Sequence, residues 1–256
     1  MSAAPGSVRR AGMPLDRAAW TSSAWRSAAT LRLHMRRHFQ EGFWLVALLA
    51  GLIGAAFLLA VGAEPGQWWR AVVLGELCIT SFYFAAVQVL RERGDGTLAA
   101  RAVSPLRTGE YLGTLAGALA LIACAEIGAL VLVVHGPAGQ WALLGAGVVM
   151  ISVIYSLYGV CVVVGYRSIS AFLMPSGAWT LVLGLPLAPL LGLPGGWWLW
   201  LHPLYPALVL VDAAFTADSP IRLVAAVALG CLWVLLAARI ASSRLESVLR
   251  PCGAVS

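Results

Sequence analysis

Six long apolar stretches constrain the fold of this chain more than any other feature. Each reaches the length of about 20 residues that an α-helix needs to cross about 30 Å of hydrocarbon. Only 11% of the 256 residues are charged, too few to give a soluble domain its polar surface. The sequence therefore predicts an all-α integral membrane protein with six transmembrane helices, at about residues 43–63, 69–90, 111–134, 141–165, 171–193 and 220–240.

The first apolar stretch has an alternative interpretation as a cleaved signal peptide. Val61, Gly62 and Ala63 resemble the small-residue site at which such peptides are cut. However, about 42 mostly polar residues precede the stretch, and it is longer than the apolar core of about 7–15 residues in a signal peptide. A retained membrane span is the favoured interpretation.

The arginines predict the orientation of these spans. All 17 basic residues are arginines, and 15 of them precede the first span, follow the sixth, or lie in the loops after the second and fourth. Only Arg70 and Arg222 fall on the opposite side. By the positive-inside rule, the arginine-rich side is cytoplasmic and both termini lie inside. Anionic lipid and topology thus explain the basic charge, and no nucleic-acid partner is predicted.

The chain before the first span divides into two parts. Residues 1–19 are rich in Ala, Gly, Ser, Pro and Arg, which predicts a disordered cytoplasmic lead. From residue 20 to 42, apolar residues recur every three or four positions and arginines occupy other faces, as in a helix lying in the membrane interface. A basic flank that only fixes topology is the alternative. The residues assigned to this helix are Trp20, Leu31, Arg32, Met35, Arg36 and Phe39.

The end of the chain contains the least regular membrane segments. Three prolines interrupt residues 171–193, and each removes a backbone hydrogen bond, so we expect this span to be kinked or broken. Residues 194–219 are too apolar for a water-exposed loop and predict short re-entrant or interfacial helices. We therefore expect one transmembrane domain over residues 43–241, followed by a cytoplasmic tail at 242–256.

Three polar residues inside the second and third spans are candidates for a substrate path. They are Glu76, Gln88 and Glu126. A carboxyl group at the bilayer centre costs about 2.5–3.5 kcal/mol on insertion scales, so it should face a cavity, a partner chain or a proton-transfer route. The alternatives are a neutral acid bonded to a neighbouring helix, or a glutamate near enough to the outer surface to be solvated.

Several kinds of chemistry have no support in the sequence. The chain has no lysine, so it lacks the Walker A motif and cannot hydrolyse ATP as a P-loop enzyme by itself. His34 and His38 have the i, i+4 spacing of zinc ligands, but no third ligand accompanies them, so we predict no metal site. The five cysteines form no CxxC pair and are interpreted as small apolar residues. We expect no enzymatic activity and no cofactor in this chain.

The loop between the second and third spans has the most specific sequence. Asp95 or Thr97 can cap a short helix, and Leu98 and Arg101 then share one face of it. Ser104-Pro105 ends the helix, because the residue before proline avoids the α region. The product is a short, basic, amphipathic helix held in the cytoplasm by two spans. A solvated charged turn is the alternative.

The run RERGDGTLAARAVSPLRTGEYL, from Arg91 to Leu112, resembles the corresponding loop of type-2 ABC exporter permeases. The six spans, the N-terminal amphipathic helix and the later LHPLYPALVLVDAAF, from Leu201 to Phe215, are similar to the same family. The motifs cover about 35–40 residues, whereas the layout covers nearly the whole chain. Ala99 departs from the pattern, since many members carry a glutamate there, which puts one contact to the ATPase in doubt.

The resemblance implies a permease subunit of an ATP-driven exporter in the bacterial inner membrane. Its partners would be a separate ATP-binding-cassette ATPase, which binds the ATP and Mg²⁺, a second permease chain, identical or related, and membrane lipid. The loop helix and the N-terminal helix would dock on the ATPase. The cargo would be an amphipathic substrate, a drug or antibiotic before a lipid or glycan. The residues to which the resemblance assigns coupling are Arg91, Glu92, Arg93, Thr97, Leu98, Arg101, Ser104 and Pro105.

Two other classes of protein remain as alternatives. One is a proton-coupled secondary transporter that uses Glu76 or Glu126 and needs no ATPase. The other is a membrane scaffold or immunity protein with no transport path.

Overall fold

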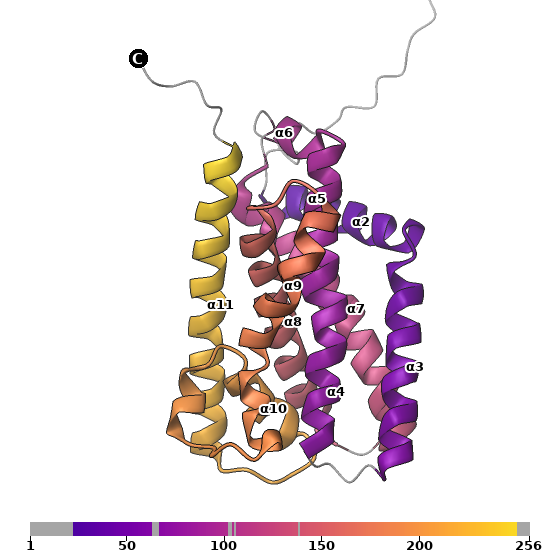
Figure 1. The fold of residues 1–256 in the computed structure, drawn as a ribbon, viewed down its shortest axis with the longest axis vertical. Helices are drawn as coiled ribbons and strands as arrows, with labels where there is room; N and C mark the ends of the chain where they lie inside the picture. The colour runs from indigo at the N-terminus through magenta and orange to yellow at the C-terminus, as the bar shows by residue number, and fades with distance from the viewer. Residues whose placement is uncertain (1–22, 63–66, 102–103, 105, 138, 250–256) are drawn as a thin grey trace, which may run out of the picture.

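The computed structural model describes residues 23–62, 67–101, 104, 106–137 and 139–249. Within these residues the regular structure is entirely helical. Long helices run side by side along the molecule, while α2 lies across one end of the bundle together with α6 (Figure 1). The short α10 lies near the opposite end. Five helices are long and apolar enough to cross a membrane, or six if one bent pair counts as a single span.

Helix α2 (Ser23–Gln40) turns sharply into the first span, α3 (Phe43–Val61). Gly42 between them has a φ of 77°, a left-handed conformation that glycine adopts without strain. Figure 1 shows α2 lying across the direction of α3, and the interfacial location of residues 20–42 stays a prediction. Trp20 and the lead 1–19 lie outside the described residues.

The side of α2 that packs on the bundle differs from the expected apolar face. The buried residues of α2 are His34 and His38, while Leu31 and Met35 are half-buried and Phe39 is 75% exposed. The histidines can be buried because side chains of the bundle offer them hydrogen-bond partners. A pattern of apolar residues alone could not show this.

The second span consists of three consecutive helical segments. It consists of α4 (Gln67–Leu77), the π-helical segment η1 (Cys78–Tyr83) and α5 (Phe84–Gly94). It reaches four residues past the predicted end at residue 90, toward the loop that carries α6 (Thr97–Arg101). A π-helical turn widens the backbone locally and is frequent at functional sites.

The third and fourth spans form the centre of the bundle. They are α7 (Thr108–Val134) and α8 (Trp141–Val163), close to the predicted boundaries. Helix α8 packs against α7, η1, α10 and α11. Gly159 of α8 has no room for a side chain, because a Cβ there would lie 2.6 Å from the carbonyl oxygen of Phe82.

The fifth predicted span is broken, as its prolines suggested. Helix α9 (Ile169–Leu183) and the 3-10 helix η2 (Leu185–Leu191) meet at an angle of 73°. Pro186 and Pro189 lie in the second piece. Two short helices then follow, η3 (Trp197–Leu201) and the largely buried α10 (Tyr205–Ala213), where the sequence predicts short helices.

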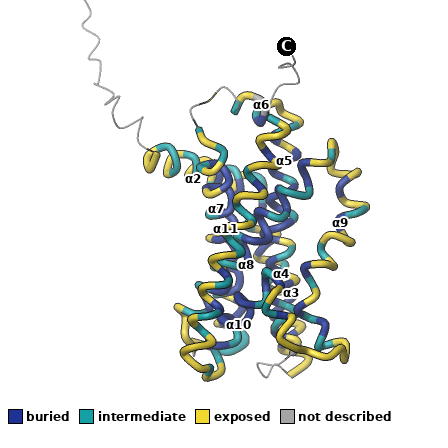
Figure 2. Tube along the Cα trace, turned by 90° about the vertical axis from the view of Figure 1, so that its left-hand side faces the viewer, coloured by how far each residue is buried: buried dark blue, intermediate teal, exposed yellow. Residues whose placement is uncertain are grey.

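The last span is longer than the prediction. Helix α11 runs from Pro220 to Leu249, so its final nine residues extend past the expected end at residue 240. The expected tail is thus helical up to Leu249, and residues 250–256 lie outside the described part. Ala241 and Leu245, one turn apart, are buried and hold this extension on the bundle. Figure 2 shows the buried positions along α7 and α8, whereas α9 is mostly exposed.

Candidate coupling site and lateral pocket

A buried carboxylate organises the end of the bundle that carries α6. Glu92 of α5 is only 2% exposed. Arg101 of α6 places its guanidinium 3.0 Å from one carboxylate oxygen, and Tyr111 of α7 donates its hydroxyl proton to the same oxygen at 3.0 Å. Arg37 of α2 lies 3.6 Å from the other oxygen. One side chain therefore connects four helices.

Two histidines of α2 extend this cluster through Gln88. The amide nitrogen of Gln88 donates to Glu92 at 3.1 Å and lies 2.6 Å from Nδ1 of His34. Its amide oxygen lies 2.6 Å from Nε2 of His38. Burial, and then the charge of Arg101, lowers the pKa of His34 to about 3, and burial lowers the pKa of His38. Both rings are therefore neutral at pH 7, and for His34 the hydrogen bond requires this, because Nδ1 must be unprotonated to accept from the Gln88 amide.

Helix α6 uses its amphipathic face inside this chain. Leu98 is 4% exposed, and the guanidinium of Arg101 lies 3.8 Å from the ring centre of Tyr111, a cation–π geometry. Thr97 donates its hydroxyl proton to the carbonyl oxygen of Glu92 at 3.1 Å. The side chains predicted to dock on a partner thus anchor α6 to its own bundle. The residues left exposed at this tip are Gly94, Asp95, Gly96, Ala100 and Ser104.

Other ionic contacts fasten the same end. Arg26 of α2 pairs with Glu110 of α7 at 2.7 Å, and Arg91 of α5 pairs with Glu41 at 3.1 Å. Arg93 donates to the carbonyl oxygens of Val164 and Tyr166 after α8, at 3.2 and 2.6 Å.

The remaining residues predicted for coupling or for the interfacial helix stand apart from this network. Ser104 is exposed and bonds the carbonyl oxygen of Arg101 within its own turn. Pro105 lies outside the described residues. Arg32 and Arg36 are exposed on α2, facing away from the cluster around Glu92.

The three polar residues predicted for a substrate path occupy two separate places. Gln88 belongs to the cluster around Glu92. Glu76 and Glu126 lie together elsewhere, on α4 and α7, beside α3. The π-helical segment η1 separates Glu76 from Gln88 along the second span.

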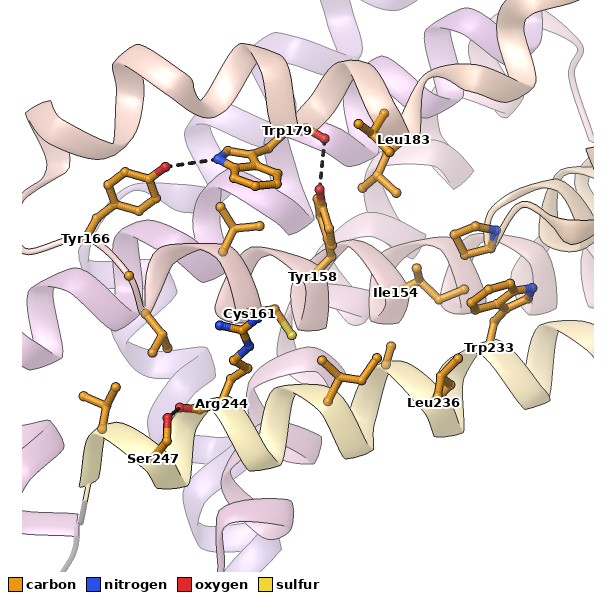
Figure 3. Close-up of a pocket in the computed structure, with 18 of the residues that line it drawn as sticks. Ile154, Tyr158, Cys161, Tyr166, Trp179, Leu183, Trp233, Leu236, Arg244 and Ser247 are labelled. Carbon is orange, nitrogen blue, oxygen red and sulfur yellow. Dashed lines mark hydrogen bonds between the residues drawn. The ribbon is translucent and has the colours of Figure 1, made fainter.

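A cavity of about 890 Å³ lies between α8, α9 and α11. Figure 3 shows Tyr158 of α8, Trp179 of α9 and Arg244 of α11 pointing into the space between these helices. Apolar side chains such as Ile154 and Leu236 form most of the remaining lining. Ligand sites of about 300–1,000 Å³ with mostly apolar walls and a few polar groups suit drug-sized molecules.

Helix α9 closes this pocket with few contacts. Only Phe172, Ser176 and Leu183 of α9 are buried. Its Trp179 donates from Nε1 to the hydroxyl of Tyr166 at 3.1 Å and accepts the Tyr158 hydroxyl at its carbonyl at 3.3 Å (Figure 3). Because so little holds it, α9 is the wall of the pocket that can move most easily.

Sequence reasoning missed two features of this region. The pocket combines residues from helices far apart in the chain, so no local motif marks it. For His34 and His38 the sequence indicates only an incomplete set of metal ligands. Among the described residues, no group of three or more histidine, cysteine, aspartate or glutamate side chains could hold a metal. The i, i+4 spacing of His34 and His38 does indicate that the two rings share one face of α2, and that face contacts Gln88.

Comparison with known proteins agrees with this architecture. The model of the fluoroquinolones export permease protein family matches residues 25–249. The chain belongs to that family. Proteins named fluoroquinolones export permease protein from two Mycobacterium tuberculosis strains, CDC 1551/Oshkosh and ATCC 25618/H37Rv, are each 29% identical to it over 208 residues. Each alignment covers 76% of this chain and 83% of the relative. The family's name describes export permeases, and the five or six span-length helices of the described residues agree with a multi-pass membrane protein.

Proposed function

We propose that this chain is the membrane subunit of an ATP-driven drug exporter in the bacterial inner membrane, with both termini cytoplasmic. ATP hydrolysis takes place on a separate ATP-binding-cassette ATPase, because these 256 residues contain no lysine for a Walker A motif. A second permease chain, identical or related, completes the transport unit. The names of the relatives make a fluoroquinolone the first cargo to test.

The cluster around Glu92 is the observation that supports coupling. A force applied to the exposed tip at residues 94–96 reaches α2, α5 and α7 together, because Glu92 bonds to a residue of each neighbouring helix. Buried charge pairs tolerate little change in geometry, since separating them leaves an uncompensated charge. The tip therefore moves with the helices and does not bend independently of them.

The pocket under α9 is the proposed cargo site. Its volume fits a drug-sized amphipathic molecule, and its aromatic side chains with one arginine match a ligand that has apolar rings and an anionic group. Motion of α9, driven from the ATPase through the cluster, opens and closes the pocket. Chemistry within this chain is limited to binding and release.

The decisive experiment reconstitutes this chain with its ATPase in proteoliposomes and follows a fluoroquinolone by its intrinsic fluorescence. ATP should drive transport, and a proton gradient without ATP should not. Transport by this chain alone, driven by a proton gradient and lost in Glu76→Gln or Glu126→Gln, would establish the secondary-transporter alternative instead.

The docking tip is tested separately. The double variant Asp95→Arg with Ala100→Arg changes exposed residues only, so it should keep the fold and abolish co-purification with the ATPase. The matched control, Ala217→Arg, changes an exposed residue in the loop before α11, at the opposite end of the bundle, and should co-purify normally. A tip variant that keeps both complex and transport would overturn the docking proposal.

A further inference from the structure

Two buried glutamates lie beside α3 and take no part in the cluster around Glu92. Glu76 ends α4 next to the π-helical segment, and Glu126 lies on α7. Each is only 7% exposed. At 1.5 Å per residue, Glu126 is about 12 Å from the Val134 end of its helix, well inside the span.

These carboxyl groups have oxygen atoms without hydrogen-bond partners. Among the described residues, neither oxygen of Glu126 nor Oε2 of Glu76 forms a hydrogen bond. Glu76 and Thr80 are polar neighbours of Glu126, but neither completes a hydrogen bond with its carboxyl oxygens. Unpaired carboxyl groups inside a bilayer are costly, and such residues mark ion or substrate sites in membrane proteins.

Glycines of α3 leave room for the two side chains. A Cβ on Gly54 would collide with Oε1 of Glu76, and a Cβ on Gly51 would lie 3.3 Å from Cγ of Glu126. The two glycines are three residues apart and so share one face of α3. Any larger residue at these positions would push the carboxyl groups aside.

A cavity of about 150 Å³ between α3 and α7 leads to Glu126. Glu126 is the one ionisable residue in its lining, and the other lining residues are apolar or glycine. Leu48, Leu52 and Val133 of this lining are each more than half exposed on the outside of the bundle. In a membrane the cavity therefore opens sideways toward lipid.

We propose that Glu126, with Glu76 beside it, binds the protonated amine of a lipophilic cation that enters from the bilayer between α3 and α7. An ammonium group supplies both the positive charge and the N–H donors that the carboxylate oxygens lack. The apolar lining accepts the hydrocarbon attached to that amine. This inference rests on the proposed function in taking the cation to be cargo.

The size of the cavity and its carboxylate oxygens, which accept hydrogen bonds, select this ligand class. It is smaller than the roughly 300–1,000 Å³ of drug-sized pockets, so it accommodates the amine-bearing end of a molecule. A bare divalent cation would need about six oxygen ligands, and two glutamates in an apolar cavity offer too few. The occupant is thus a small ring or chain that carries an ammonium group.

Binding is measured on the full chain, without the ATPase, in nanodiscs of uncharged phosphatidylcholine at pH 7. The first probe is 1-phenylpiperazine, a protonated secondary amine. The second is 4-phenylmorpholine, which has the same shape and no positive charge. Isothermal titration should show that the piperazine binds at least tenfold more tightly than the morpholine. Equal affinity for the two probes would overturn the proposal.

Two variants locate the site. Glu126→Gln should weaken binding of 1-phenylpiperazine at least tenfold and leave 4-phenylmorpholine unchanged, because a charge-assisted hydrogen bond is lost. Gly51→Ala keeps both carboxyl groups but places a methyl against Glu126, and should weaken the same probe. Asp218→Asn, the matched removal of an acid outside the cavity, should bind like the unmodified chain. Full binding by monodisperse Glu126→Gln would overturn the assignment.

The binding assay separates this inference from the proposed function. Charge-selective binding in the absence of ATP-driven export would retain the amine site and reject the exporter proposal. ATP-driven export by Glu126→Gln at the normal rate, for a cargo with a protonated amine, would retain the exporter and reject the amine site as part of its path.

Discussion

Glu92 and Glu126 are both buried acids of the same bundle, yet their surroundings are opposite. Glu92 accepts hydrogen bonds from Gln88 and Tyr111 and pairs with Arg101. Glu126 forms no hydrogen bond among the described residues and lines a cavity. The first acid lies where four helices meet, and the second lies beside a cavity between α3 and α7.

The difference shows how burial of a charge should be interpreted. A buried acid whose partners come from several helices fixes their relative positions, and its removal should damage the fold. A buried acid without such partners does not hold helices together, and inside a membrane it is a candidate ligand site. The two regions should therefore respond in opposite ways to the same kind of substitution.

The largest expected effect is at Glu92. Replacement by alanine leaves the half-buried guanidinium of Arg101 without its partner, which should lower the free energy of unfolding by about 3–5 kcal/mol. Unfolding in mixed micelles titrated with sodium dodecyl sulfate, followed by circular dichroism, measures the change. The double variant Glu92→Met with Arg101→Met should lose less. If the single variant is as stable as the unmodified chain, the cluster is not what holds these helices together.

The second expected effect is a pH dependence of the stability, caused by His34 beside the cluster around Glu92. The pKa of His34 is lowered in the folded protein, so below its ordinary pKa of about 6.5 the unfolded chain binds a proton that the native chain does not. Stability should fall as the pH drops from about 6.5 toward 3, by about 1.4 kcal/mol per unit, or about 2 kcal/mol at pH 5. His34→Gln should remove this part of the slope. An unchanged slope in that variant would show that His34 titrates normally.

The third expected effect concerns the packing of α8 on the π-helical segment η1, which lies between Glu76 and Gln88 in the second span. Gly159→Ala would bring a methyl to within 2.6 Å of the carbonyl oxygen of Phe82, which cannot rotate away, and should cost about 1–3 kcal/mol. Gly128→Ala in α7 meets open space and is the matched control, expected to be neutral or stabilising. The same micelle titration compares them. Equal stability of the two variants would contradict the close approach of α8 and η1.

The smallest expected effect on stability is at Glu126. Glu126→Gln keeps the shape of the side chain and removes only the ability to ionise, so the free energy of unfolding should stay the same or rise by up to about 1 kcal/mol. The measurement is that used for Glu92→Ala. A loss similar to that of Glu92→Ala would show that Glu126 has structural partners, and the contrast between the two acids would disappear.

The spans were predictable because the information they need is local. Apolar length placed α7 and α8 within about three residues of their observed ends, and the prolines of residues 171–193 indicated the break after α9. The extension of α11 to Leu249 was missed because hydropathy reports contact with lipid and not helix formation. Ala241 and Leu245, spaced by four, were the signal that the helix continued.

The candidate sites were only partly predictable. The motif from Arg91 to Arg101 predicted the short helix α6, and it also contains Glu92 at the end of α5. An amphipathic face shows that some surface will be buried, but it does not show against what. The pattern of Leu98 and Arg101 could therefore not show that Leu98 is buried within this chain or that Arg101 lies over the ring of Tyr111.

The sequence by itself determined the class of protein, the positions of its spans and the break in the fifth. Hydropathy and proline geometry act over a few residues, so they can be read along the chain. The tertiary structure decided which buried polar groups have partners, because those contacts join distant positions, such as His38 with Gln88, 50 residues away. Whether a buried acid holds helices together or awaits a ligand depends on that pairing, and only packing in three dimensions creates it.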